Sequence, residues 1–407
     1  MKFFQVASLS DCHEIVQKRL PQDALAPEVL PCVDAVGLAL AEDVHAQDVF
    51  PPYTRSTVDG YAVVAQDVYC CSASLPAFLK VVGKVAMGEM PSVVCHKGEA
   101  VQIATGGVLP EGANAVVMVE HIQTLGEQIA VYSPVKQGEN LVKRGEELEA
   151  GDLIARRGDL VTPLLVGVLA SVGIDHVAVY RPIRVAVIST GDELVGVDEE
   201  VTPGKIRDVN TSLLTAVAKG SGYQVVSTAR IPDDEALFLS ILQEALDQAD
   251  WVLVSGGSSI GAKDLTEKVL SRGKILLHGL ALKPGKPTII AAFGDKTVYG
   301  LPGNPFAALC VFRVMIDEVV KSARGQAVPT LRAYAKTNFP STPGRATIVP
   351  VSVEWAGDRY LATPLFLKSA HLYTAMRADG YVLLPEQAEG VYQGELLTVY
   401  PLEGGLV

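Results

Sequence analysis

The stretch that decides the fold runs from Trp251 to Asp264 and reads W-V-L-V-S-G-G-S-S-I-G-A-K-D. Its first four residues are apolar and rich in β-branched side chains, which is typical of a short strand buried on both faces. Small residues follow, and a helix is expected to begin near Asp264. Backbone N–H groups in such a loop, next to a helix start, can hold an anion. The stretch therefore predicts a phosphate site at the carboxyl edge of an open α/β sheet. An ordinary tight strand–helix turn has a similar composition and stays open as the alternative.

The composition predicts a folded protein of several domains. A chain of 407 residues is too long for one ordinary core and is expected to form about two to four domains. Hydrophobic residues make up 49%, charged residues 20% and aromatic residues 6%. The 34 basic and 46 acidic residues give a net charge of -12, which argues against nucleic acid as a partner because basic patches hold phosphate backbones. A small anionic substrate in a locally basic pocket remains compatible with this charge.

The cysteine and histidine patterns exclude two kinds of site. The six cysteines contain no C-x-x-C pair and no disulfide-like framework, so we expect free thiols in a reducing compartment. The seven histidines contain no H-x-x-x-H pair, so we do not expect a zinc site. No signal peptide is recognisable, and no apolar run approaches the roughly 18 residues of a membrane span. We therefore expect a cytoplasmic protein that does not contact a membrane.

Changes in hydrophobic period along the chain divide it into domains. From Arg184, strands alternate with helices. Asn210 is expected to cap one of these helices, Asp233 or Asp234 to start another, and Pro305 to open a long one. The fold class is therefore α/β and multi-domain. We expect an elongated connecting domain at 1–47 and 142–180, an inserted β-rich domain at 48–141, a doubly wound, mostly parallel α/β domain at 181–325, and a C-terminal β-barrel-like domain at 326–407.

Five loops at the carboxyl edge of the α/β sheet combine small residues with charged ones. The acidic residues are Glu193, Asp233, Asp234 and Asp264, and the basic residues are Lys263, Lys283 and Lys286. Carboxylate oxygens suit Mg²⁺, which would bridge to phosphate oxygens, and the lysines would balance the remaining negative charge. Each residue taken alone could be a capping acid or a solvated lysine. Because five loops repeat the same chemistry, we expect an anionic ligand that carries phosphate. No Ser-His-Asp order is recognisable, so covalent nucleophilic catalysis is not expected.

Six motifs occur in the order and spacing of a known family across nearly the whole chain. They are S-T-V-D-G-Y-A (Ser56–Ala62), I-A-T-G-G (Ile103–Gly107), S-T-G-D-E-L (Ser189–Leu194), S-G-G-S-S-I-G-x-x-D (Ser255–Asp264), K-P-G-K-P (Lys283–Pro287) and L-P-G-N-P (Leu301–Pro305). With these motifs the chain resembles the MoeA-type molybdopterin molybdotransferases, the family that includes the E domain of gephyrin. The resemblance implies an elongated homodimer with its active site near the subunit interface. It also implies an enzyme that binds adenylylated molybdopterin, inserts molybdate at the dithiolene, and hydrolyses the adenylate with Mg²⁺ to release AMP. The molybdopterin adenylyltransferase would then be a partner.

The resemblance also implies roles for individual residues. Asp59 and Thr105, otherwise turn residues, would complete the catalytic site from the inserted domain, across the dimer. Glu193, Asp233 or Asp234, and Asp264 would hold the metal or position the hydrolytic water. Lys283, Lys286 and Ser369 would bind molybdate or phosphate. The remaining substrate-binding residues implied are Ser255, Gly256, Gly257, Ser258, Gly261, Pro302, Gly303, Asn304 and Pro305.

Departures from the family pattern keep alternative functions open. Pro350 stands near the position where the family commonly has a further arginine, Phe306-Ala307 follow the last loop proline, and Leu265 replaces a common aromatic residue. A non-catalytic pterin-binding scaffold or a tungstate-specific paralogue is compatible with these changes. The preceding adenylylating step uses a related α/β domain, but the extra domains and their motifs argue against it.

Overall fold

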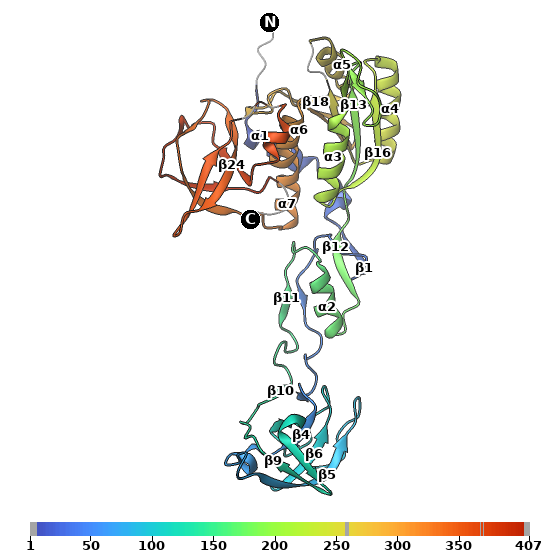
Figure 1. Cartoon of the computed structure of the whole chain (residues 1–407). Coiled ribbons are helices and arrows are strands. Elements are labelled where there is room, and N and C mark those ends of the chain that lie inside the picture. The colour runs from blue at the N-terminus through green and yellow to red at the C-terminus, as the bar shows by residue number, and fades with distance from the viewer. Residues whose placement is uncertain (1–5, 257–259, 367, 369, 403–407) are drawn as a thin grey trace.

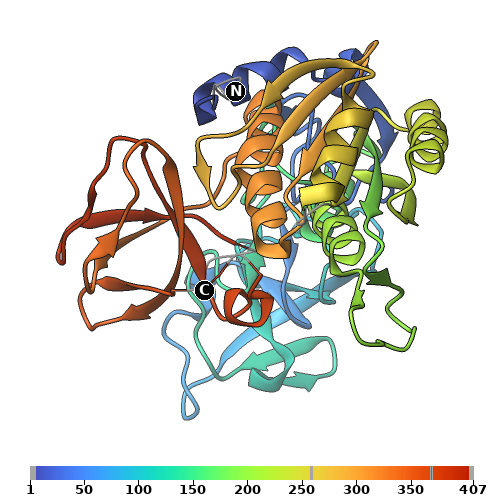
Figure 2. The same cartoon turned by 90° about the horizontal axis from the view of Figure 1, so that it is seen from above.

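The computed structural model describes residues 6–256, 260–366, 368 and 370–402, without the side chains of 260–264. The molecule is elongated (Figure 1): the α/β domain and the C-terminal β domain form one end, the connecting domain the middle, and the inserted β domain the other end. The view along the long axis shows the α/β and C-terminal domains side by side (Figure 2). This arrangement confirms the predicted fold class.

The α/β domain is built on a six-stranded sheet. The strand order is β16 (Gln224–Ile231), β13 (Arg184–Thr190), β17 (Trp251–Gly256), β21 (Lys296–Leu301), β20 (Ile289–Phe293) and β18 (Lys274–His278). The first four strands are parallel, and β20 runs antiparallel to its neighbours β21 and β18. Ser189 of β13 is in register with Ser255 of β17. The polar ends of these two central strands therefore lie side by side at one edge.

Helices cover both faces of this sheet because successive strand side chains point to opposite faces. Val185 and Val187 belong to one core with residues of α1 (Leu9–Lys18), α3 (Val209–Gly220) and α6 (Pro305–Val311). Ala186 and Ile188 belong to a second core with α4 (Glu235–Gln248) and the end of α5 (Ile260–Leu270). The helix predicted from Pro305 is confirmed and continues through η4 (Phe312–Asp317) into α7 (Glu318–Arg324).

Two details correct the sequence-based expectations. Helix α1 packs in the α/β core through Cys12 and Val16, so residues 1–47 do not belong wholly to the connecting domain. Asn210 does not cap α3, because Asp208 is the N-cap residue and accepts a hydrogen bond from the Thr211 N–H.

The C-terminal domain is a mixed sheet that reaches into the α/β domain. Its order is β19 (Leu282–Lys283), β24 (Ala346–Trp355), β25 (Tyr360–Pro364), β22 (Leu331–Ala335) and β28 (Leu396–Val399), and β26 (Gly380–Leu384) also pairs with β24. A minor sheet pairs β23 (Phe339–Pro340) with β27 (Gly390–Val391), and α8 (Leu372–Ala375) is a single helical turn. Because β19 comes from the α/β region, Lys283 lies in the sheet of the C-terminal domain.

The inserted domain and the connecting domain form the rest of the molecule. The inserted domain is one sheet in the order β7 (Ala115–Met118), β4 (Gly60–Val63), β6 (Glu99–Ile103), β5 (Ala77–Val85), β9 (Gln128–Val131) and β8 (Ile122–Leu125). In the connecting domain, β1 (Pro27–Pro31) pairs with β12 (His176–Tyr180), and β2 (Val44–His45) pairs with β11 (Leu153–Ala155). These strands lie beside α2 (Pro163–Ser171). The connecting domain is joined to the inserted domain by β3 (Arg55–Ser56) and β10 (Leu141–Val142). Among the described residues, no helix is both long and apolar enough to cross a bilayer.

Candidate functional site

A cavity of about 480 Å³ lies at the carboxyl edge of β13 and β17. Ser189, Thr190 and Ser255, at the ends of these strands, line it and are each only 1% exposed. The start of α3, the segment between β14 (Leu194–Val195) and β15 (Ile206–Arg207), the loop before α6, and Ala370 complete the lining. The cavity therefore sits where ligands bind in open α/β sheets.

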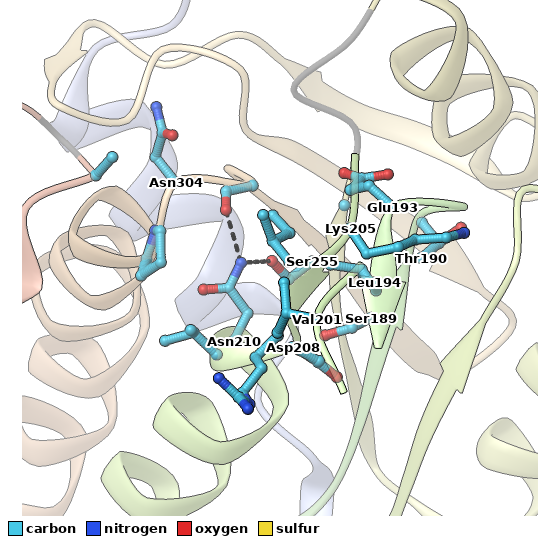
Figure 3. Close-up of a pocket in the computed structure, with 17 residues that line it drawn as sticks. Ser189, Thr190, Glu193, Leu194, Val201, Lys205, Asp208, Asn210, Ser255 and Asn304 are labelled. Atoms are coloured by element: carbon cyan, nitrogen blue, oxygen red, sulfur yellow. Dashed lines mark hydrogen bonds between the residues drawn. The ribbon is translucent and has the colours of Figure 1, made fainter. Parts of the chain in front are cut away.

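Asn210 ties together three elements of this cavity. Its Nδ2 donates to Ser255 Oγ at 2.7 Å and to the Gly303 carbonyl at 2.7 Å, as Figure 3 shows. Ser255 Oγ in turn donates to the Pro302 carbonyl at 3.4 Å. Asn210 Oδ1 is buried without a hydrogen-bond partner. A buried acceptor without a partner is costly, so this oxygen has an unused capacity to accept a hydrogen bond.

A row of hydroxyl and carboxylate groups runs under the cavity. Thr211 Oγ1 donates to Asp208 Oδ2 at 2.5 Å and lies 2.8 Å from Ser189 Oγ. Thr190 Oγ1 donates to Asp233 Oδ1 at 2.9 Å. These hydrogen bonds between buried and half-buried groups tie the ends of the strands to the start of α3 and to Asp233. They make the edge a preorganised polar surface.

The segment from Leu194 to Arg207, which we call the arm, brings basic side chains to the cavity. Lys205 and Arg207 both line it. Lys205 Nζ donates to the Asp192 carbonyl at 2.5 Å, and Arg207 Nε donates to the Val197 carbonyl at 2.9 Å. These two basic residues bring positive charge to the lining of a cavity in an acidic protein, as expected for a site that holds an anion.

Six of the predicted site residues come together in this cavity: Glu193, Ser255, Gly256, Gly303, Asn304 and Pro305. A glycine is required at position 256 because Thr190 of the neighbouring strand approaches it closely. A Cβ added there would lie 2.3 Å from Thr190 Cγ2 and 2.6 Å from the Thr190 carbonyl oxygen. The edge therefore needs a glycine at this position.

Other predicted residues lie beside the cavity without lining it. Asp233 accepts a hydrogen bond from Thr190, which lines the cavity. Asp234 is instead the N-cap of α4 and accepts a hydrogen bond from the Leu237 N–H at 2.8 Å. Pro302 lines a smaller neighbouring cavity. Lys283 Nζ donates to Thr342 Oγ1 of the C-terminal domain at 3.0 Å, and Lys286 is exposed. Lys283 thus lies at the boundary between the α/β domain and the C-terminal domain.

Asp59 and Thr105 form a pair of their own in the inserted domain. The Thr105 N–H and Oγ1–H donate to Asp59 Oδ1 at 2.7 Å and 3.0 Å. The backbone hydrogen bond first, and then the hydroxyl, lower the pKa of Asp59. The inserted domain lies at the far end of the chain from the α/β domain (Figure 1), so one subunit does not bring this pair to the cavity.

The structure leaves several of the predicted site residues undescribed, wholly or in part. Gly257, Ser258 and Ser369 are not among the described residues, and Gly261 and Asp264 are described only as part of the backbone of α5. Over the described residues, no group of three or more His, Cys, Asp or Glu side chains is placed to hold a metal ion. The metal set Glu193, Asp234 and Asp264 thus stays a prediction.

Among the lining residues that the sequence pattern did not single out as ligand-binding, four carry charged or amide side chains. They are Lys205, Arg207, Asp208 and Asn210. A usable signal was present, because K-I-R-D-V-N (Lys205–Asn210) leads into the helix that starts at this edge with Val209. Two of the departures from the family pattern, Phe306 and Ala307, are buried in the core at the start of α6, and Pro350 is buried within β24.

Three family models match successive parts of the chain. They are the MoeA N-terminal region (domain I and II) at residues 7–173, the "Probable molybdopterin binding domain" at 186–322, and the MoeA C-terminal region (domain IV) at 332–402. The molybdopterin molybdenumtransferase of Haemophilus influenzae is 31% identical over 92% of this chain and 93% of its own length.

Solved structures agree with these matches. Two structures of molybdopterin biosynthesis MoeA proteins from Pyrococcus horikoshii are 34% and 27% identical, with TM-scores of 0.75 and 0.76. Each match covers 98% of this chain and 100% of the solved chain. The chain therefore belongs to the MoeA family.

Proposed function

We propose that this protein is a molybdopterin molybdenumtransferase that inserts molybdate into adenylylated molybdopterin and releases AMP. The observation that carries the proposal is the cavity at the sheet edge, which is lined by hydroxyl, amide and basic groups. It suits a ligand with a phosphate group and a polar ring system. The named relatives in the same family support the choice of substrate.

The residues of the cavity divide into two groups by chemistry. Lys205 and Arg207 supply positive charge for a phosphate, and the Gly256 position lets the backbone come close to it. Asn210 Oδ1 supplies an acceptor for a ring N–H, while its Nδ2 keeps Ser255 and the loop at Gly303 in place. The proposed role of these groups is to bind and orient the substrate.

Glu193 is the described carboxylate best placed to hold Mg²⁺, with Asp264 as a second proposed ligand. Glu193 lines the cavity, whereas Asp233 already accepts a hydrogen bond from Thr190. Since Mg²⁺ often binds through one or two carboxylates plus substrate phosphates, this set fits it. The ion would neutralise charge on the phosphate oxygens during hydrolysis.

A homodimer would complete the site. Asp59 and Thr105 are held together by two hydrogen bonds but lie at the far end of the same chain, so they would serve the partner's cavity. Large apolar side chains of the connecting domain support such an interface: Val29, Val33 and Leu164 are 66%, 68% and 79% exposed. Lys283, Lys286 and Ser369 are the proposed oxyanion ligands. The proposed partner that supplies the substrate is the molybdopterin adenylyltransferase.

Single-turnover AMP release from adenylylated molybdopterin, with Mg²⁺ and either molybdate or tungstate, tests the proposal. Release that depends on molybdate is expected. Release only with tungstate would indicate a tungstate-specific paralogue, and tight pterin binding without release would indicate a scaffold. Glu193→Gln should slow release, whereas Glu200→Gln, an exposed residue of the arm that does not line the cavity, should not.

A further inference from the structure

The loop that follows β5 in the inserted domain carries two exposed methionines. Met87 and Met90 are 69% and 64% exposed. A Cβ built on Gly106 would lie 3.0 Å from Met87 Cε and 3.3 Å from Met87 Sδ, so this side chain lies against the residue that follows Thr105. We call residues 86–91 the methionine loop. If Thr105 serves the cavity of another subunit, the methionine loop reaches that cavity with it.

Three exposed apolar side chains come from the segment of the C-terminal domain that supplies Ala370 to the main cavity. Phe366, Tyr373 and Met376 are 73%, 74% and 69% exposed. Helix α8 follows Ala370 directly, and the Leu372 N–H donates to the Ala370 carbonyl at 3.2 Å. Side chains three residues apart on a helical turn share one face, as Tyr373 and Met376 do. We call the three exposed side chains the lip of the cavity.

The methionine loop and the lip match in chemistry. Methionine is flexible and makes favourable contacts between its sulfur and aromatic rings, and Phe366 and Tyr373 offer exposed rings. Glu89 stands between the two methionines, whereas Lys368 and Arg377 belong to the segment that carries the lip. These three charged side chains are exposed and form no ion pair within the described part of the chain. Opposite charges would therefore complement the apolar contact.

A single chain does not bring the two surfaces together. The inserted domain and the C-terminal domain lie at opposite ends of the molecule (Figure 1). Single exposed apolar side chains need no explanation on a protein surface. Here, however, one group lies next to Thr105 and the other next to Ala370, on the two parts that the proposed dimer brings to one site.

We propose that the methionine loop packs on the lip of the partner subunit, so that a second copy of this chain closes over the cavity. This inference rests on the proposed function, in which Asp59 and Thr105 serve the partner's cavity. The contact would fix the position of that pair relative to the bound substrate. Met87 and Met90 are then positioning residues, because they act through the Asp59–Thr105 pair.

Cross-linking tests the contact without an assay of activity. The variant Met90→Cys/Tyr373→Cys is made in a Cys70→Ser background, because Cys70 is exposed, and is treated with a short bis-maleimide. We expect a covalent dimer on a denaturing gel. Phe78→Cys/Tyr373→Cys in the same background is the matched control and should give little dimer. Phe78 is also exposed, but it lies near the other end of β5, about 23 Å before Val85 at the strand rise of about 3.3 Å per residue.

A lysine in the contact should slow the reaction. Met90→Lys would bring a positive charge to the basic segment that carries the lip, so single-turnover AMP release should slow at least about tenfold, because like charges in an interface repel. Because Met90 is exposed in the single chain, the variant should fold normally. Phe78→Lys introduces the same charge at an exposed position of the same domain and should release AMP at close to the wild-type rate.

The outcomes separate the inference from the proposed function. Equal cross-linking by the two cysteine pairs, no cross-linking by either, or wild-type release by Met90→Lys would each overturn the inference. Selective cross-linking through position 90 in a protein whose wild type releases no AMP would support the contact and overturn the proposed function instead.

Discussion

Asn210 and Ser255 lie on different elements, yet Asn210 Nδ2 donates to Ser255 Oγ at 2.7 Å and joins the first turn of α3 to the end of β17. The same nitrogen also binds the Gly303 carbonyl at 2.7 Å. One side chain thus sets the relative positions of three segments that line the cavity. Its oxygen is buried without a hydrogen-bond partner, and we propose that it accepts a hydrogen bond from the ligand.

Replacement of Asn210 by alanine should therefore weaken both the fold and the reaction. We expect a loss of about 1–3 kcal/mol in the free energy of unfolding, because two acceptors lose their donor. We expect kcat/KM to fall at least tenfold, about the cost of one strong hydrogen bond to the substrate. Chemical denaturation and steady-state AMP release measure the two effects.

Asn338→Ala provides the control for removing an asparagine. Asn338 Oδ1 accepts from the Gln393 N–H at 2.8 Å in the C-terminal domain, and Asn338 does not line the cavity. Its replacement should leave kcat/KM close to that of the wild type. Equal kcat/KM values for the two variants would refute the assigned role of Asn210.

Gly256→Ala should destabilise the protein and distort the site. The new Cβ would meet Thr190 Cγ2 at 2.3 Å and the Thr190 carbonyl oxygen at 2.6 Å, so the pairing of β13 and β17 must shift at the cavity. Overpacking of this kind costs about 1–3 kcal/mol. Thermal unfolding should show a lower Tm, and substrate affinity should fall with it.

Gly220→Ala is the matched control for that variant. A Cβ on Gly220, the last residue of α3, meets nothing within 4 Å. Because alanine favours helix over glycine by up to about 1 kcal/mol, the Tm should stay level or rise. If the Gly256→Ala protein were as stable as the Gly220→Ala protein, the backbone at this edge would be able to shift and accommodate the added methyl group.

The sheet edge itself was predictable from sequence, and the reason is chemical. Alternating strands and helices determine a parallel sheet, and small residues directly after Val254 indicate the edge where backbone groups are free. Glu193, Ser255 and Asn304 were placed in the site on this basis, and they line the cavity.

The residues that were missed depend on contacts between distant segments. Asn210 resembles an N-cap in sequence, but Asp208 takes that position and accepts from the Thr211 N–H at 3.0 Å. In the sequence, Lys205 and Arg207 resemble ordinary solvent-exposed basic residues. Only the three-dimensional position of the arm brings them to the cavity. The pairing of β19 with β24, which puts Lys283 in the sheet of the C-terminal domain, was not predicted either. Local spacing does not encode these long-range pairings.

Asp250 should give the protein a stability that is lost in acid. Its side chain is 5% exposed and contacts Arg184 at 2.8 Å, Arg181 at 3.2 Å and Lys296 at 3.7 Å. Burial raises its pKa, but the hydrogen bonds from Arg184 and the charge of Arg181 outweigh this, so the pKa lies below its usual value. The carboxylate therefore stabilises the fold above about pH 4, the unfolded value. This stabilisation falls away as the pH drops through the lower folded pKa.

Asp250→Asn should cost about 3–5 kcal/mol near neutral pH, because removing one partner leaves the other charges partly buried. The difference between wild type and variant should shrink below about pH 4. Urea denaturation at a series of pH values measures it. Asp295→Asn, an exposed neighbour in the hairpin between β20 and β21, is the control and should change stability little. A constant difference across the acid range would contradict the assignment.

Mixing two inactive variants tests whether the site spans two subunits. Asp59→Ala removes the carboxylate held by Thr105, and Glu193→Ala removes the proposed metal ligand in the cavity. Each variant alone should be nearly inactive. If Asp59 serves the partner's cavity, a mixed dimer contains one site with both residues intact. Random reassortment of equal amounts should then restore about a quarter of wild-type activity. If Asp59 acts on the cavity of its own chain, no intact site forms and the mixture stays inactive, so the two arrangements differ in a single assay.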